Sequence, residues 1–214
     1  KGSFSEYKLK KDETANLPLF REDAIKIIVD NLNDSDIIVT TTGVASRELF
    51  EYREELKQGH EKDFLTVGGM GHANQIALGI ALQKPNRRVF CLDGDGAALM
   101  HMGSMAINGN IECDNFKHII FNNGAHDSVG GQPTVGYTTD FQSIAKASGY
   151  NLVLQAETNE EIVKYIEDLK ALEGKVFLEV KVKKGFRKDL GRPTTTPKEN
   201  KQNLMGFIKE SYHE

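Results

Sequence analysis

The chain has 214 residues, 39% hydrophobic and 27% charged, which is enough for one domain with a well-packed core. Its formal net charge of −4 argues against nucleic acid binding, because contact with a phosphate backbone requires a basic face. We find no signal peptide and no apolar run of membrane length in the sequence, and we therefore expect a cytoplasmic protein. The two cysteines, Cys91 and Cys113, lack the spacing of a zinc site or a redox pair.

Residues 1–18 are polar and rich in Lys and Glu, and we interpret them as a linker or interdomain arm. Residues 19–214 are expected to form one domain, in which apolar periodicity separates helices from strands. The expected helices are 21–32, 46–58, 73–82, 98–107, 140–148, 159–172 and 198–210. The expected strands are 36–41, 64–67, 88–92, 117–121, 151–155 and 176–182. Strands that alternate with helices predict a three-layer α/β/α fold with a mainly parallel sheet of roughly six strands.

Two segments between these elements stand out. Residues 122–138 form a long Gly-rich loop, and a loop of that length in a compact domain is usually functional. Residues 187–197 form an extended arm with two prolines, and we interpret its Arg187, Arg192 and Thr194–Thr196 as a surface tail.

The most informative motif is Gly94-Asp95-Gly96, followed after twenty-five residues by Asn122-Asn123. Each part follows a short apolar run, which places both at the C-terminal ends of buried strands, where open α/β sheets bind ligands. Carboxylate and amide oxygens suit Mg²⁺ that carries a diphosphate. Gly-Asp-Gly alone would indicate only a turn, but the Asn pair at this spacing disfavours that interpretation.

This pattern resembles the diphosphate-binding motif of thiamine-diphosphate enzymes. Residues 91–103 and 122–133 are similar in particular to the phosphonopyruvate decarboxylases, and the similarity runs from about Leu19 onward. The resemblance implies thiamine diphosphate and Mg²⁺ as cofactors. It also implies decarboxylation of 3-phosphonopyruvate to phosphonoacetaldehyde and CO2 in phosphonate (2-aminoethylphosphonate) biosynthesis.

The resemblance assigns roles to single residues. Asp95, Asn123 and the backbone carbonyl of Ala125 are the implied Mg²⁺ ligands, and Asn122 is structural. The Gly68 carbonyl would accept from the cofactor's 4′-amino group, and Met70 would force its folded shape; a Gly-rich turn with a core Met is the equal alternative. The candidate catalytic residues are Gly68, Met70, His72 and His126. The candidate cofactor-binding residues are Thr42, Gly43, Gly68, Met70, Gly94, Asp95, Gly96, Ala97, Asn123 and Ala125.

His72, His126, Ser46 and Arg47 are candidates for the substrate pocket, because a small anion requires cations and hydrogen-bond donors around it. A single His more often makes a structural hydrogen bond, and Arg47 could equally be a solvated helix residue.

One requirement is missing. The acid that protonates N1′ of the cofactor normally comes from a separate pyrimidine-binding domain across a subunit interface, and no second α/β domain fits in this chain. We expect either the C-terminal half of a longer decarboxylase or one subunit of a two-chain enzyme, and the start at Lys1 favours an excised half. The complete enzyme is expected to be a homo-oligomer, and this chain alone to be inactive.

Three alternatives stay open at this point. The substrate could be another 2-oxo acid, especially sulfopyruvate. The motif could belong to a nicotinamide-binding Rossmann domain, although Leu99 occupies the place of its third Gly or Ala. The chain could also be a non-catalytic module that binds cofactor or only assembles.

Overall fold

The computed structural model describes residues 14–209 and confirms the predicted three-layer α/β fold. A six-stranded sheet has the order β2-β1-β3-β4-β8-β7, and every neighbouring pair is parallel. Its strands are β1 (Ile37–Thr40), β2 (Asp63–Leu65), β3 (Val89–Gly94), β4 (Phe116–Asn122), β7 (Leu152–Ala156) and β8 (Val176–Lys181).

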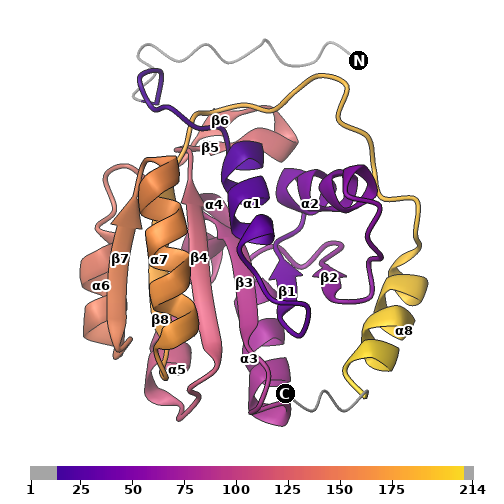
Figure 1. Cartoon of the computed structure of the whole chain (residues 1–214). Coiled ribbons are helices and arrows are strands. Elements are labelled where there is room, and N and C mark those ends of the chain that lie inside the picture. Colours follow the sequence, from indigo (N-terminus) through magenta and orange to yellow (C-terminus); the bar gives the residue numbers. More distant parts are fainter. Residues whose placement is uncertain (1–13, 210–214) are drawn as a thin grey trace.

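Helices cover both faces of this sheet (Figure 1). On one face lie α1 (Arg21–Asp30), α2 (Val44–Glu55) and α7 (Asn159–Ala171), and on the other α3 (Ala73–Gln83), α5 (Gly103–Asn110) and α6 (Phe141–Ser148). Strand β3 shows why the sheet needs both layers: Phe90 and Leu92 join one apolar cluster, whereas Val89 and Cys91 join the other. Strands buried on both faces are typical of parallel sheets.

The strand order creates a switch point between β1 and β3. Strand β1 lies between β2 and β3, so the chain leaves β1 towards β2 on one side and returns as β3 on the other. The loops that leave these two strands therefore diverge, and a crevice opens outside their C-terminal ends, where open α/β sheets bind ligands. Thr41 and Thr42 follow β1 there, and Asp95 follows β3.

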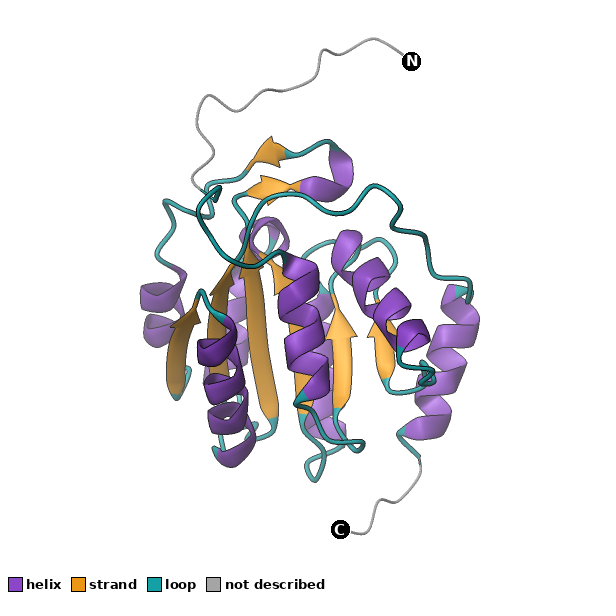
Figure 2. Ribbon diagram, turned by 45° about the horizontal axis from the view of Figure 1, so that its top comes forward, coloured by secondary structure: helices purple, strands orange, loops and turns teal. Residues whose placement is uncertain are grey.

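Two segments differ from the sequence-based prediction. The predicted helix 98–107 is wrong: α4 (Asp95–Met100) ends at His101, and α5 begins at Gly103. Glycine is a poor residue for a helix interior, and the break lets α5 pack on α6. The predicted loop 122–138 contains an antiparallel hairpin, β5 (Ala125–His126) and β6 (Gln132–Pro133), joined through a 3₁₀ turn η1 (Asp127–Val129) (Figure 2).

The C-terminal part of the chain closes the β2 edge of the sheet. Residues 187–196 run over the molecule to α8 (Pro197–Phe207), which begins one residue earlier than predicted and ends before the undescribed Glu210. On α8, the Asn200 side chain accepts from the Leu65 N–H at 3.0 Å and donates to the Asp63 carbonyl at 2.8 Å. These bonds give edge strand β2 some of the pairing that a further strand would supply.

Most of the predicted 1–18 linker lies outside the described residues. Thr14 is buried, and its hydroxyl accepts from the Lys184 N–H at 2.9 Å. None of the helices within residues 14–209 has the length and apolar character needed to cross a membrane.

Two helical glycines provide a matched test of the packing between α5 and α6. A Cβ at Gly109 would lie 1.8 Å from the Ser148 carbonyl oxygen, whereas a Cβ at Gly79 on α3 meets nothing within 4 Å. We expect Gly109→Ala to lower the free energy of unfolding by about 2 kcal/mol or more, because the helices must separate. Gly79→Ala should raise it by about 0.5–1 kcal/mol, because alanine favours the helix. Urea denaturation measures both; equal effects would contradict the close approach.

Candidate functional site

The polar residues of the sequence motif meet in a small cavity at the switch point. Its volume is about 50 Å³, comparable with one or two water molecules, so it has room for a cation but not for a whole organic cofactor. The predicted site residues that line it are Thr42, Met70, Gly94, Asp95, Gly96, Ala97, Asn123, Ala125 and His126.

Asp95 lies at the start of α4 and is only 2% exposed. Burial raises the pKa of its carboxyl to about 6, although hydrogen bonds from Thr134 and from the backbone of Gly96 and Asn123 oppose that rise. The chain beyond the hairpin covers this carboxylate: a Cβ at Gly136 would lie 2.5 Å from its Oδ2 atom. Asp95 is therefore a shielded carboxylate that would be stabilised by a cation.

Asn123 has its side-chain amide held in one orientation. The Nδ2 group donates to Oδ2 of Asp127 at 2.6 Å, and Oδ1 accepts from the Ala125 N–H at 3.1 Å. Because a carboxylate accepts only from the nitrogen, Asp127 fixes which end of the amide is the oxygen. The amide oxygen, the potential metal ligand, is thereby directed towards Ala125.

Asp127 connects this amide to three other parts of the fold. Its Oδ2 atom also accepts from Arg21 Nη1 at 3.3 Å and from the Gly185 N–H at 3.1 Å. Arg21 in turn makes a two-point ion pair with Glu48, at 2.7 and 3.1 Å. The sequence analysis missed Arg21, Glu48 and Asp127; the signal available was an acidic residue four positions after Asn123.

Asn122 has the contacts of a structural residue. Its Nδ2 group donates to the Gly136 carbonyl at 3.0 Å and to Glu179 at 2.7 Å, and its Oδ1 atom accepts from the Gly124 N–H at 3.2 Å. These bonds tie the end of β4 to β8 and to the chain beyond the hairpin.

The turn at residues 68–71 needs glycine for its backbone. Gly68, Gly69 and Gly71 have φ of 71°, 54° and 87°, in the left-handed region that other residues rarely adopt. The Gly68 N–H donates to Thr42 Oγ1 at 3.2 Å, which joins this turn to the end of β1. Met70 thereby reaches the cavity.

The two candidate histidines lie in different surroundings. His126 lines the cavity and packs closely on the start of α4, since a Cβ at Gly96 would lie 2.5 Å from its Nδ1 atom. His72 is exposed; its Nδ1 atom lies 3.0 Å from the Gly69 carbonyl oxygen and its ring packs against His101 at 4.2 Å. The structure thus brings His126, but not His72, into the wall of this cavity as the described residues form it.

A buried polar cluster on β3 and β4 lies next to the Gly94-Asp95-Gly96 motif. Potential ligand atoms of Cys91, Asp93 and His118 lie within 4.8 Å of one another, a proximity that cysteine spacing could not reveal. Burial raises the pKa of the Cys91 thiol well above its usual value, and a neutral thiol is a poor metal ligand. Asp93 instead accepts from the Gly94 N–H at 2.9 Å, and His118 bonds to Tyr150 at 3.0 Å, so the cluster braces the end of β3.

Comparison with known proteins agrees with this arrangement. Residues 41–180 match the family model of the thiamine pyrophosphate enzyme, C-terminal TPP binding domain. The chain is 33% identical to a phosphonopyruvate decarboxylase of Streptomyces viridochromogenes, over 86% of this chain and 45% of that protein. It is 31% identical to the sulfopyruvate decarboxylase subunit beta of Methanococcus maripaludis, over 91% of this chain and 100% of that subunit.

Among solved structures, the benzoylformate decarboxylase of Polynucleobacter necessarius has a TM-score of 0.66 at 17% identity. The matched region covers 88% of this chain and 36% of the benzoylformate decarboxylase chain, and this likeness shows the shared fold. The chain spans less than half the length of the phosphonopyruvate decarboxylases that it matches.

Asp127 is expected to position Asn123 for a metal. We expect Asp127→Ala to weaken Mg²⁺ binding by about tenfold or more, as is usual when the partner of a metal ligand is removed. The matched control is Asp36→Ala: the Asp36 and Asp127 side chains are 1% and 4% exposed and each pairs with an arginine, but Asp36 precedes β1, at the opposite end of the strands. The control should lower stability and leave Mg²⁺ affinity unchanged. Unchanged affinity in Asp127→Ala, measured by calorimetry, would show that Asn123 is oriented without it.

Asp95 should make stability depend on pH. Because its folded-state pKa is raised from 3.8 to about 6, the stability it contributes is full below about pH 3.8 and is lost as the pH rises through about 6. Asp95→Asn removes this titration, so the stability of the variant relative to the unsubstituted protein should rise by about 2–3 kcal/mol between pH 4 and pH 8. Urea denaturation at several pH values measures it, and a difference independent of pH would contradict the raised pKa.

Proposed function

The chain belongs to the thiamine pyrophosphate enzymes, and we propose that it is the half of a 2-oxo acid decarboxylase that binds the diphosphate of thiamine diphosphate through Mg²⁺. The observation that carries this proposal is the meeting of Asp95 and Asn123 in one cavity at the switch point of the sheet.

The residues present fit a magnesium ion. Asp95 supplies a carboxylate, Asn123 an amide oxygen and Ala125 a backbone carbonyl, and Mg²⁺ prefers such oxygen ligands when phosphate and water complete its octahedron. Thr41 also lines the cavity, and its hydroxyl is buried with no hydrogen-bond partner among residues 14–209. A buried carboxylate and an unsatisfied hydroxyl are the groups that a hydrated cation would stabilise.

The same surroundings indicate how the rest of the cofactor would be held. The start of α4, at Gly94, Gly96 and Ala97, offers backbone N–H groups to a diphosphate, and Thr42 and Gly43 lie at the neighbouring strand end. Gly68 and Met70, on the turn joined to Thr42, would contact the pyrimidine side. Thiamine diphosphate, when bound, supplies the electron sink for loss of CO2 from a 2-oxo acid.

The chain's own residues would position the reactants. His126, in the cavity wall, is the proposed donor to the substrate, and His72 on the exposed turn is a second candidate. The β5–β6 hairpin and Thr134 exclude water from Asp95, which strengthens its interaction with a cation.

The proposed substrate is 3-phosphonopyruvate, and the products are phosphonoacetaldehyde and CO2, as in phosphonate biosynthesis. Two phosphonopyruvate decarboxylases are each 33% identical to this chain over 86% and 88% of its length, which supports this choice. Sulfopyruvate is the alternative, because a sulfopyruvate decarboxylase subunit beta matches along its whole length. Relative turnover of the two acids by the assembled enzyme distinguishes them, and a strong preference for sulfopyruvate would overturn our choice.

The proposed enzyme needs a pyrimidine-binding partner that supplies the N1′ acid. That partner is either another part of a longer chain or a separate subunit, as the name subunit beta implies for the relative from Methanococcus maripaludis. We also propose that the assembled enzyme is an oligomer.

Calorimetric titration with thiamine diphosphate tests the cofactor site. We expect binding that requires Mg²⁺ and is lost in Asp95→Ala, because the cavity then lacks its carboxylate. The control is Asp114→Ala. Asp114 is an exposed acid just before β4, at the opposite end of the strands, and this variant should bind the cofactor as the unsubstituted protein does.

Repeating the titration with the pyrimidine-binding half present separates two reasons for a negative result. Mg²⁺-dependent binding that appears only in the assembly would show a site completed by the partner. No binding in either form would overturn the proposed function. The 214-residue chain alone should show little decarboxylase activity, since it lacks the N1′ acid.

A further inference from the structure

A second and larger cavity lies beside the proposed metal site. Its volume is about 300 Å³, at the lower end of small-molecule pockets. The first turn of α2, the end of β2 and the arm that leads to α8 form its walls, and Thr42 lines both cavities. A ligand that reaches from one cavity into the other would therefore pass Thr42.

Two arginines line this cavity, Arg47 from α2 and Arg192 from the arm. They differ from the other five arginines of the chain. Four of those five pair with carboxylates and one donates to backbone carbonyls; they are Arg21, Arg53, Arg88, Arg187 and Arg87. Neither Arg47 nor Arg192 has an ion-pair or hydrogen-bond partner within residues 14–209. The two arginine side chains of residues 14–209 that have no protein partner, half-buried Arg47 and exposed Arg192, thus line one cavity.

Two hydroxyl groups in the same cavity also lack hydrogen-bond partners among the described residues. Thr66 is 7% exposed, and its Oγ1 atom and that of Thr195 are buried with no hydrogen bond among the described residues. A buried hydroxyl without a partner costs free energy, and an acceptor-rich ligand would remove that cost. Leu65 and Val67 supply an apolar wall beside these polar groups.

The arm that carries Arg192 and Thr195 is fixed at both ends. Before the cavity, Arg187 pairs with Glu22 at 3.1 Å and with Glu51, and the Gly191 N–H donates to Glu51. At its other end, the Asn200 side chain bonds to the Asp63 carbonyl and the Leu65 N–H on the outer side of β2. Arg192, Thr194 and Thr196 are exposed, in keeping with the surface position expected from the sequence, and the arm also forms one wall of the cavity.

We propose that this cavity binds the tetrahedral anionic group on C3 of the 2-oxo acid substrate, a phosphonate or a sulfonate. This inference rests on the proposed function. Arg47 and Arg192 would neutralise its charge, and Thr66 and Thr195 would donate hydrogen bonds to its oxygens. Three oxygens on one centre can accept from all four side chains, whereas the planar carboxylate of a dicarboxylic analogue offers only two. A three-carbon substrate is short, and the contact of both cavities at Thr42 meets that requirement.

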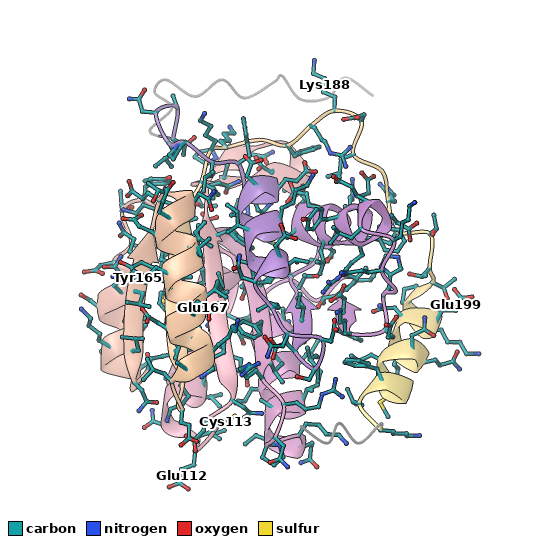
Figure 3. The ribbon with its side chains drawn as sticks, viewed as in Figure 1. Glu112, Cys113, Tyr165, Glu167, Lys188 and Glu199 are labelled. Carbon is teal, nitrogen blue, oxygen red and sulfur yellow. The ribbon has the colours of Figure 1, made fainter. Side chains whose placement is uncertain are left out.

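The test uses the enzyme assembled with its pyrimidine-binding half, thiamine diphosphate and Mg²⁺. The variants are Arg47→Gln, Arg192→Gln and the double variant, and Arg47→Lys retains the charge. The matched control is Lys188→Gln, on the same arm, whose side chain points away from the domain (Figure 3). Calorimetry measures binding of methylphosphonate and of methanesulfonate, and steady-state kinetics measures KM for phosphonopyruvate, sulfopyruvate and pyruvate.

We expect each Gln variant to raise the Kd of methylphosphonate and the KM of phosphonopyruvate by about tenfold or more, the usual effect of losing a charged hydrogen bond. Parameters for pyruvate, which lacks the anionic group, should stay unchanged, as should all parameters of Lys188→Gln. The unsubstituted enzyme's ratio of affinities for methylphosphonate and methanesulfonate identifies which tetrahedral group the cavity prefers.

Unchanged methylphosphonate affinity in the double variant, or an equal loss with pyruvate, would overturn the assignment. So would the absence of methylphosphonate binding to the unsubstituted enzyme. Arginine-dependent methylphosphonate binding without turnover of any 2-oxo acid would support the anion site and overturn the proposed decarboxylase function, so the two failures are distinguishable.

Discussion

The burial of the Asp95 carboxylate is the constraint on which the site depends. A charge that is 2% exposed is costly, and the raised pKa of Asp95 records that cost. Three hydrogen-bond donors around the carboxylate lower that cost: the Thr134 hydroxyl and the backbone N–H groups of Gly96 and Asn123. These donors do not remove that cost, so a bound cation would stabilise the site. The free energy of the proposed metal binding would thereby be linked to the stability of the fold.

The strand order brings these donors together. Because the chain leaves β1 and β3 in opposite directions, the crevice between them is open to segments from elsewhere, and the β5–β6 hairpin covers it. Asp127 in that hairpin then binds Asn123, Arg21 and Gly185, which belong to the end of β4, to α1 and to the segment after β8. Two distant parts of the chain, α1 and the segment after β8, thus act through Asp127 on one amide group, and rigid support of this kind lets a metal site form without rearrangement.

Local patterns predicted much of this and failed where distant residues decide. The six strands could be read from short apolar runs between helical segments, and Asp95 and Asn123 could be placed at one edge because parallel strands end together. The break at His101 was missed, although Gly103 disfavours a continuous helix, because the apolar residues on either side favour one and the packing of α5 on α6 is not visible in the local sequence. Arg21 and Asp127 are 106 positions apart, and no periodicity links them. Arg192 is exposed, as the sequence analysis expected, but that it lines a cavity together with Arg47 could not be predicted, because the two lie on distant elements.

The arrangement also indicates how the two halves of the proposed enzyme would divide their work. The groups that we propose to bind charge lie in this half: the oxygens of Asp95 and Asn123 for the cation, and the guanidinium groups of Arg47 and Arg192 for an anion. The two sets have opposite charge preference and meet at Thr42, so a substrate with an anionic end would be oriented with that end away from the Asp95 carboxylate. Orientation of the substrate's tail would then come from this half, whereas activation of the cofactor requires the N1′ acid of the partner. Substrate selection and cofactor activation would be separable by substitution in different halves of the assembly.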